Sequence, residues 1–225
     1  MADDESIKLG FASPPCYAHE LELYDNGYMG IDPQAALDVA RWRKAKRNEL
    51  ISARLTLSVK ERRALADDIA QELDRIITPT KGTIISMYWP MKGELDLRRW
   101  MKEKVAAGSR IALPVVTVKA QPMIFREWKP GIDMEPGIWQ IPVPANTDEV
   151  TPDVVIAPLV GYDAECFRLG YGGGYFDRTL ATLNPRPQVI GIGYENSHLS
   201  TIFPQPHDIP MDLIITGKGE IISRE

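Results

Sequence analysis

Residues 153–183 read DVVIAPLVGYDAECFRLGYGGGYFDRTLATL, and this stretch decides the fold class of the chain. It begins with a short apolar run, Asp153–Pro158, which predicts a buried strand because turn residues follow it. Four glycines come next within five positions, at 170 and 172–174. A helix is predicted to begin at the glycines near 172 and to run to about Leu183. A buried strand that leads through a loop into a helix is the repeating unit of an α/β protein.

The regions on either side continue this alternation. Short apolar runs between turns predict further strands at Thr83–Tyr88, Arg110–Leu113, Met123–Trp128, Gln188–Tyr194 and Leu213–Thr216. Alternating strands and helices favour parallel strand pairing with helices on the faces of the sheet. The predicted fold class is therefore α/β, with a mixed, mostly parallel sheet flanked by helices.

Three further helices are predicted in the first half of the chain. Residues Gln34–Leu55 are strong helix formers with a basic face. Ser58 and Glu61 form a capping-box pattern, which predicts a second helix that stops at Thr78-Pro79. A third helix ends at Gly108 and carries Leu97, Trp100, Met101, Lys104 and Val105.

The beginning of the chain differs in composition from the rest. Residues 1–34 mix glycine, proline and aspartate with scattered aromatics. They show neither helical nor strand periodicity, so they are predicted to form an irregular N-terminal arm. Residues 35–225 are predicted to form a single α/β domain, because a chain of this size can bury a core without disulfides or metals.

Composition and charge exclude several classes of protein. Hydrophobic residues make up 44% and charged residues 25% of the chain, as in a globular protein rather than a disordered or fibrous one. The net charge of −5 gives no overall attraction to a polyanion, so no nucleic-acid partner is expected. No apolar run approaches the roughly 20 residues that span a bilayer, so no membrane partner is expected. Two distant cysteines and an N-terminus without a signal-peptide pattern predict a cytoplasmic location.

The glycine loop is the main candidate for a functional site. Without side chains its backbone can come close to a phosphate, and successive amides together with a helix N-terminus would form an anion site. Arg168 and Arg178 flank the loop, and Asp177 lies where a carboxylate could hold Mg²⁺ against phosphate oxygens. The alternative is a tight strand-to-helix turn in which Asp177 only complements the helix dipole. Neither standard nucleotide-binding glycine pattern is present.

Three motifs resemble the signatures of one enzyme family. They are RLGYGGGYFDR at 168–178, PLVGYD at 158–163 and HDIPMD at 207–212. Shorter matching pieces, including Arg43-x-x-x-Arg47, occur in order between about residues 41 and 217. Together these motifs are similar to those of the 5-formyltetrahydrofolate cyclo-ligase (5,10-methenyltetrahydrofolate synthetase) family. The resemblance implies the architecture that this family shares with sugar-phosphate isomerases and CoA transferases.

The resemblance also implies an activity. Members of the family cyclise 5-formyltetrahydrofolate to 5,10-methenyltetrahydrofolate and convert ATP to ADP and phosphate, through a phosphorylated formyl (imidate phosphate) intermediate. The expected cofactors are therefore ATP and Mg²⁺. The expected partner is this small-molecule folate, with or without a polyglutamate tail, and the chain is expected to be a monomer or a homodimer.

The same resemblance implies the roles of individual residues. Arg43 and Arg47 are expected to bind the ATP phosphates, and Lys44 is the alternative to Arg43. Two expected catalytic residues, Arg168 and Tyr175, belong to a longer segment that surrounds the phosphates and the formyl group: Arg168, Leu169, Gly170, Tyr171, Gly172, Gly173, Gly174, Tyr175 and Phe176. The metal-binding positions correspond to Asp177 and Asp208. The substrate-binding positions correspond to Trp89, Glu94, Trp139, Tyr171 and Tyr175.

Departures from the family pattern leave two alternatives open. The family commonly has other residues at the positions of Leu97, Val143, Cys166, Phe176 and His198. A diverged paralogue would bind a nucleotide or a folate-like ligand without this turnover. An isomerase or acyl-CoA transferase of similar architecture would not depend on ATP, and likeness of fold alone does not decide function.

Overall fold

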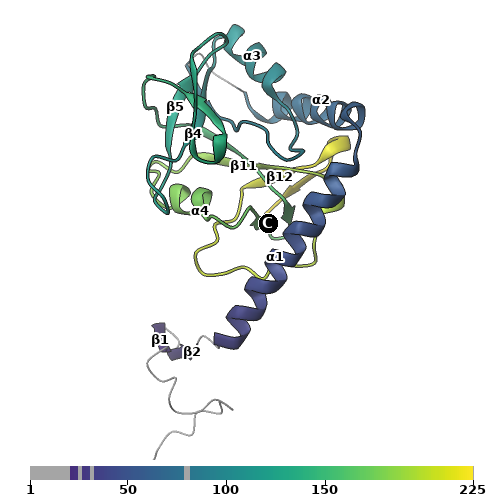
Figure 1. Cartoon of the computed structure of the whole chain (residues 1–225), viewed down its shortest axis with the longest axis vertical. Coiled ribbons are helices and arrows are strands. Elements are labelled where there is room, and N and C mark those ends of the chain that lie inside the picture. Colours follow the sequence, from purple (N-terminus) through teal and green to yellow (C-terminus); the bar gives the residue numbers. More distant parts are fainter. Residues whose placement is uncertain (1–20, 25–26, 31–32, 79–81, 225) are drawn as a thin grey trace, which may run out of the picture. The chain divides into compact units, whose positions relative to one another are not determined.

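The computed structural model describes residues 21–24, 27–30, 33–78 and 82–224, which belong to two compact units, Met1–Trp42 and Arg43–Glu225 (Figure 1). In the first unit, β1 (Leu21–Tyr24) pairs antiparallel with β2 (Gly27–Gly30). The prediction of an irregular conformation is therefore wrong for these two strands. Alternation in Leu21-Glu22-Leu23 and the Asn26-Gly27 dipeptide are hairpin signals that the mixed composition concealed. Residues 1–20 of the predicted arm lie outside the described residues, and the division of the chain at residue 34 stays a prediction.

The two long helices agree closely with the sequence. Helix α1 (Pro33–Thr56) begins in the first unit and continues into the second, one residue longer at each end than predicted. Helix α2 (Val59–Ile76) follows a complete capping box. The Glu61 amide donates to Ser58 Oγ at 3.2 Å, and the Ser58 amide donates to Glu61 Oε2 at 2.7 Å. Two amides at the helix N-terminus are thereby satisfied, so the start of α2 is fixed locally.

Ser58→Ala is expected to lower the free energy of unfolding by about 1 kcal/mol, because the cap acceptor for the Glu61 amide is lost. For a chain of this size the midpoint of thermal unfolding should fall by about 3 °C. Ser58→Asp, which retains a cap acceptor, should stay near the wild-type midpoint. An unchanged midpoint in Ser58→Ala would show that tertiary packing alone fixes this end of α2.

A seven-stranded sheet forms the centre of the second unit, with the order β13-β12-β11-β8-β3-β4-β5. The five inner strands run parallel, and both edge strands pair antiparallel with their neighbours. This confirms the mixed, mostly parallel sheet, and all six predicted strands are present. The strands are β3 (Ile84–Ser86), β4 (Arg110–Val115), β5 (Ile124–Trp128), β8 (Val154–Pro158), β11 (Gln188–Ile192), β12 (Leu213–Ile215) and β13 (Ile221–Ser223).

Shorter elements connect these strands. Helix α3 (Arg98–Ala106) links β3 to β4, as predicted. Two small antiparallel hairpins are formed by β6 (Met134–Pro136) with β7 (Pro142–Pro144) and by β9 (Gly161–Tyr162) with β10 (Arg168–Leu169). The single-turn helices η2, η3 and η4 span Ile138–Gln140, Glu195–Ser197 and Gly217–Gly219.

Helix α4 (Tyr175–Leu180) is shorter than predicted, with six residues. The predicted helix began near residue 172 and ran to about Leu183. It begins later because Gly172 and Gly174 have φ values of +92° and +63°, outside the right-handed helical region. The C-terminal end lies before Asn184-Pro185, and proline disfavours a helical conformation in the residue that precedes it.

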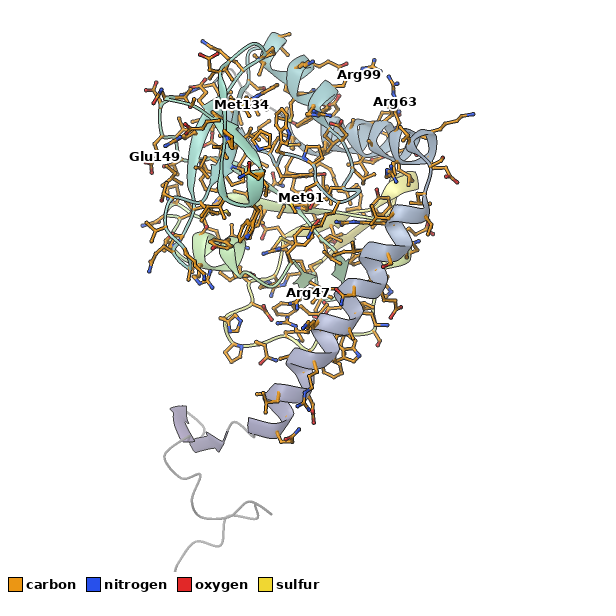
Figure 2. All side chains as sticks on the ribbon, in the orientation of Figure 1. Arg47, Arg63, Met91, Arg99, Met134 and Glu149 are labelled. Carbon is orange, nitrogen blue, oxygen red and sulfur yellow. The ribbon has the colours of Figure 1, made fainter. Side chains whose placement is uncertain are left out.

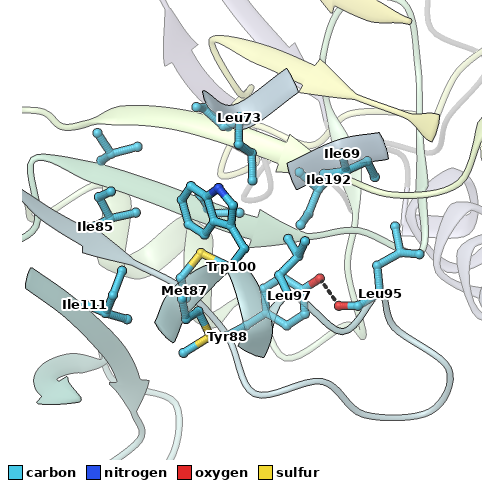
Figure 3. Packing of buried hydrophobic residues seen from close by; sticks show 14 of the residues in the cluster. Ile69, Leu73, Ile85, Met87, Tyr88, Leu95, Leu97, Trp100, Ile111 and Ile192 are labelled. Atoms are coloured by element: carbon cyan, nitrogen blue, oxygen red, sulfur yellow. Dashed lines mark hydrogen bonds between the residues drawn. The ribbon is translucent and has the colours of Figure 1, made fainter. Parts of the chain in front are cut away.

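Two hydrophobic clusters cover the two faces of the sheet. On one face, Leu73 of α2 and Trp100 of α3 pack over Ile85 and Ile111 of the sheet (Figure 3). On the other face, Leu180 of α4 belongs to a cluster that contains alternate residues of the same strands. Both faces are therefore buried, which is why these strands read as continuous apolar runs. Within the described residues, no helix combines the length and the apolar character that a membrane span requires.

Candidate functional site

The order of the strands opens a crevice at the carboxyl ends of β3 and β8. The chain leaves β3 through α3 toward β4 on one side, whereas β8 neighbours β11 on the other side. Open α/β sheets bind ligands where strand order reverses in this way. A cavity of about 530 Å³ lies there, lined by the loops after β3 and β8, the end of β4, and α1 from Arg43 onward. Figure 2 shows two of its lining side chains, Arg47 on α1 and Met91 on the loop after β3.

Most of the predicted site residues line this cavity. Two lie outside it: Lys44 is exposed, and Leu169 is fully buried in a cluster with Leu50 and Ile202. Of the two alternatives on α1, Arg43 is thus the one that borders the cavity. The predicted residues in the lining are Arg43, Arg47, Trp89, Glu94, Trp139, Arg168, Gly170, Tyr171, Gly172, Gly173, Gly174, Tyr175, Phe176, Asp177 and Asp208.

The glycine loop presents unpaired backbone donors. Within the described part of the chain, none of the five amides of residues 170–174 donates to a backbone oxygen. The two positive φ values, at Gly172 and Gly174, turn the backbone sharply without the strain that a side chain would add. Successive unpaired amides on such a turn form a concave site for an anion.

Arginines supply positive charge around this loop, which leads into the six-residue helix α4. Arg47 Nε donates to the Gly170 carbonyl at 2.7 Å, and Arg178 Nη1 donates to the Gly173 carbonyl at 2.8 Å. A Cβ at Gly170 would lie 2.5 Å from Arg168 Nη1. A larger residue than glycine at 170 would displace the Arg168 guanidinium, which packs directly against the backbone.

Arg168 is one of the buried charges that line the cavity, with 8% of the residue exposed. Its Nη2 donates to Asp177 Oδ2 at 3.0 Å, and its guanidinium lies 4.8 Å from the centre of the Phe176 ring. Burial lowers the pKa of Arg168. Its Nε has no hydrogen-bond partner among the described residues. A buried N–H without an acceptor is costly, so this atom fits an anionic oxygen brought by a ligand.

The two predicted metal ligands are both paired with arginines. Asp177 accepts from Arg168 and, at 3.3 Å, from the Ile209 amide. Asp208 Oδ2 accepts from Arg43 Nη2 at 2.5 Å and from the Gln205 amide at 2.7 Å. The described residues contain no group of three or more His, Cys, Asp or Glu side chains that could hold a metal alone. Two carboxylates still fit Mg²⁺, which commonly takes one or two from the protein and the rest from phosphates and water.

Glu94 lies on the loop after β3, in the same cavity. The residue is 9% exposed, and burial raises the pKa of its carboxyl group. The Met91 amide donates to Oε2 at 2.9 Å, and the Tyr171 hydroxyl donates to Oε1 at 3.0 Å. A carboxylate oxygen can accept two hydrogen bonds, so each oxygen retains acceptor capacity for a ligand with adjacent N–H donors.

Aromatic side chains complete the lining. Trp139 is 63% exposed and lies edge-on to Tyr175, with ring centres 5.5 Å apart. Its φ of +58° is unusual for a residue with a large side chain, and it stands on the loop between β6 and β7. Trp89 packs edge-on against Trp128 at 6.4 Å. Exposed and half-exposed rings of this kind can pack against a flat ligand.

Sequence reasoning did not assign Arg54 to the site. This arginine is 3% exposed, and it donates to the Tyr171 hydroxyl and to the Lys92 carbonyl. Arg54 follows Arg43-x-x-x-Arg47 on α1 and also matches the family pattern, and this match was the signal that could have identified it.

Of the residues that depart from the family pattern, only Val143 and Phe176 line the cavity. Leu97 and Cys166 are buried in the two core clusters, and the His198 ring packs against Tyr162. The departures at these three positions therefore affect packing rather than the lining of the site.

These groups define a class of protein. Free amides and arginines beside two carboxylates suit the phosphates of a nucleotide with Mg²⁺, and a buried carboxylate among aromatic rings suits a flat heterocycle with neighbouring N–H donors. The chain is thus an α/β protein with a cavity that can hold a phosphate chain next to a second, heterocyclic ligand.

Comparisons with known proteins identify the family within this class. The model of the 5-formyltetrahydrofolate cyclo-ligase family matches residues 39–217. A 5-formyltetrahydrofolate cyclo-ligase from Mycoplasma pneumoniae is 31% identical over 179 residues, which cover 78% of this chain and 99% of the relative. The enzyme of that name from Haemophilus influenzae is 24% identical over 184 residues, 78% of this chain and 97% of the relative. The NMR structure of 5,10-methenyltetrahydrofolate synthetase from Aquifex aeolicus matches with a TM-score of 0.70 and 26% identity, over 80% of this chain and 92% of that one. The chain belongs to the 5-formyltetrahydrofolate cyclo-ligase family.

Proposed function

We propose that this enzyme cyclises 5-formyltetrahydrofolate to 5,10-methenyltetrahydrofolate with ATP and Mg²⁺ and releases ADP and phosphate. One observation carries the proposal: the arginine-lined glycine loop and the buried carboxylate of Glu94 share a single cavity. Such a cavity brings a phosphate donor next to a folate ring, which is the arrangement that this reaction needs.

The chemistry explains why ATP is required. A formamide oxygen is a poor leaving group, and transfer of the terminal phosphoryl group to it gives an imidate phosphate. The neighbouring folate N–H nitrogen then attacks the formyl carbon and loses its proton, the C–O bond breaks, and phosphate leaves with its electron pair. The protein does little covalent work in such a reaction, so its residues act mainly by position and charge.

On the phosphate side, the loop amides, Arg43, Arg47 and Arg168 would hold the anionic oxygens. The unpaired Nε of Arg168 supports a direct contact, because the ligand would supply the acceptor that this buried atom lacks. Asp177 and Asp208 would hold Mg²⁺ in cooperation with the phosphates. These carboxylates pair with Arg43 and Arg168, so they also neutralise the two arginine charges.

On the folate side, Glu94 would accept from the ring N–H and the amino group of the pterin, which form a pair of donors suited to a carboxylate. Trp139 and Tyr175 would pack along the ring system, and Tyr175 would lie between the folate and the glycine loop. Trp89 is a further candidate for contact with the pterin. The Tyr171 hydroxyl, already bonded to Glu94, would connect the two halves of the site.

The direct test is the absorbance of methenyltetrahydrofolate formed from 5-formyltetrahydrofolate, with and without ATP and Mg²⁺. Product should form only when both are present, with one phosphate released for each product. A diverged paralogue would bind ATP without product or phosphate release, and an isomerase or CoA transferase would show no dependence on ATP. Well-folded protein that gives no product would overturn the proposal.

Glu94→Gln is expected to raise the KM for 5-formyltetrahydrofolate about 30-fold, since a charged hydrogen bond is worth about 2 kcal/mol. The amide keeps the shape but offers one acceptor and opposes the second pterin donor with its own N–H. ATP affinity should not change. Glu103→Gln, which removes an exposed carboxylate on α3, should leave both constants at wild-type values. A wild-type KM in Glu94→Gln would show that Glu94 does not bind the pterin.

We also propose that the enzyme is cytoplasmic and that it is a monomer or a homodimer. The absence of a nucleic-acid partner is likewise an expectation from the net charge of −5.

A further inference from the structure

Arg54 is a buried charge that the proposed reaction does not use directly, and it does not line the cavity. Its Nε donates to the Lys92 carbonyl at 2.8 Å, and its Nη2 donates to the Tyr171 hydroxyl oxygen. That hydroxyl donates in turn to Glu94 Oε1 at 3.0 Å. A chain of hydrogen bonds therefore runs from α1, through the tip of the glycine loop, to the carboxylate on the loop after β3.

The chemistry of the three groups fixes the direction of this chain. Arginine has donors and no acceptor, so the Tyr171 oxygen must accept from Arg54. The single hydroxyl proton of Tyr171 is then free to point at Glu94. A carboxylate that receives a hydrogen bond from a polarised hydroxyl is stabilised as the anion.

Arg54 also fixes the backbone that carries Glu94. Its bond to the Lys92 carbonyl joins the loop to α1, and the Tyr194 hydroxyl holds the Gly93 carbonyl at 2.6 Å. Gly93 has a φ of +77°, and a Cβ there would lie 3.1 Å from Leu55 Cδ2. The positive φ favours glycine, and the loop lies close against α1 at this point, so the orientation of Glu94 depends on this attachment.

We propose that Arg54 is a positioning residue of the folate subsite: through Lys92 and Tyr171 it holds Glu94 in the orientation and the ionised state that the pterin donors need. The inference rests on the proposed function, because it takes Glu94 as the pterin acceptor. It goes further in assigning a substrate-affinity role to a residue that touches neither substrate.

The charges around Glu94 determine the pH dependence that follows. Burial raises the pKa of Glu94, whereas the Tyr171 hydrogen bond and the positive charges of Arg54 and Lys92 lower it. Two phenols also face it, Tyr88 at the end of β3 and Tyr194 after β11, and burial raises the pKa of both, so they are neutral at physiological pH. Without Arg54, less positive charge opposes the effect of burial, so the pKa of Glu94 rises further and its carboxylate is protonated at a higher pH. Folate binding should then weaken at a higher pH than in the wild type.

The test measures the Kd of 5-formyltetrahydrofolate by calorimetry, without ATP, between about pH 5.5 and 8. In Arg54→Gln the Kd at pH 7 should rise about tenfold. The acid limb of the profile, which is the pH range over which folate binding is lost on acidification, should move to higher pH. The Kd of a non-hydrolysable ATP analogue should stay within about twofold, because Arg47 and Arg178 still hold the glycine loop. The matched control is Arg63→Gln, which removes an exposed arginine from α2 and should change neither constant.

Tyr171→Phe provides the second variant, because it keeps Arg54 and the aromatic ring and removes only the hydroxyl that joins Arg54 to Glu94. If Arg54→Gln unfolds, Tyr171→Phe decides the question by the same shift of the acid limb. A wild-type acid limb in the folded variants, together with lost folate binding in Glu94→Gln, would overturn this inference and leave the proposed function intact. Wild-type folate binding in Glu94→Gln would instead overturn the pterin assignment itself.

Discussion

Arg168→Gln is expected to lower kcat/KM for the cyclisation by about 10³-fold. Charge on the transferring phosphoryl group must be stabilised, and an arginine at that position commonly contributes an effect of this size. Arg168 is buried against the glycine loop, with one N–H left without a partner among the described residues. Glutamine keeps hydrogen-bonding capacity but removes the charge. The measurement is the initial rate of methenyltetrahydrofolate formation over a range of ATP and Mg²⁺ concentrations.

A stability measurement separates the catalytic effect from a structural one. Arg168→Gln also leaves the Asp177 carboxylate buried without its cation, which should cost about 3 kcal/mol of unfolding free energy. The double variant Arg168→Gln/Asp177→Asn makes the pair neutral and should recover most of this loss. At saturating Mg²⁺, which offsets the loss of the Asp177 carboxylate, its activity should remain as low as that of the single variant. Recovery of activity together with stability would mean that Arg168 serves the fold and not the reaction.

Local sequence signals were sufficient for most of the fold. Ser58 and Glu61 make their capping box within four residues, so no tertiary contact is needed to place the start of α2. The run Val154–Pro158 is apolar throughout because both faces of β8 are covered, and the sequence records this directly. The glycine loop was recognised as a candidate site because only a close approach to the backbone requires so many glycines.

The remaining features depend on contacts between distant segments. Arg43 and Lys44 are adjacent on α1, and which of them borders the cavity depends on how the helix is rotated against the sheet. The role of Arg54 depends on Tyr171, 117 residues further along the chain. The contact of Arg47 with the Gly170 carbonyl joins α1 to a loop 123 residues further along the chain. Periodicity and motif spacing carry no information about such pairings.

Asp177→Asn is expected to raise the Mg²⁺ concentration at half-maximal rate about tenfold, because an amide oxygen binds Mg²⁺ without the charge of a carboxylate. The ion pair with Arg168 adds a second expectation of opposite sign. Once Asp177 is neutral, Arg168 loses its hydrogen-bonded counter-charge and retains only the charge of Asp208 nearby, so ATP without Mg²⁺ should bind at least as tightly as in the wild type. Rates measured against Mg²⁺ concentration and calorimetry with ATP in the presence of a chelator test the two expectations.

Weaker use of Mg²⁺ together with undiminished binding of ATP without Mg²⁺ distinguishes a metal ligand from a residue that only supports Arg168. If Asp177 served only to orient Arg168, its loss would weaken ATP binding with and without Mg²⁺ and leave the Mg²⁺ midpoint unchanged. Asp212→Asn is the matched control, because Asp212 pairs with Arg186 outside the cavity and accepts from the Val189 amide. Its Mg²⁺ midpoint should equal that of the wild type. A raised midpoint in Asp208→Asn but not in Asp177→Asn would assign the metal to Asp208, which pairs with Arg43.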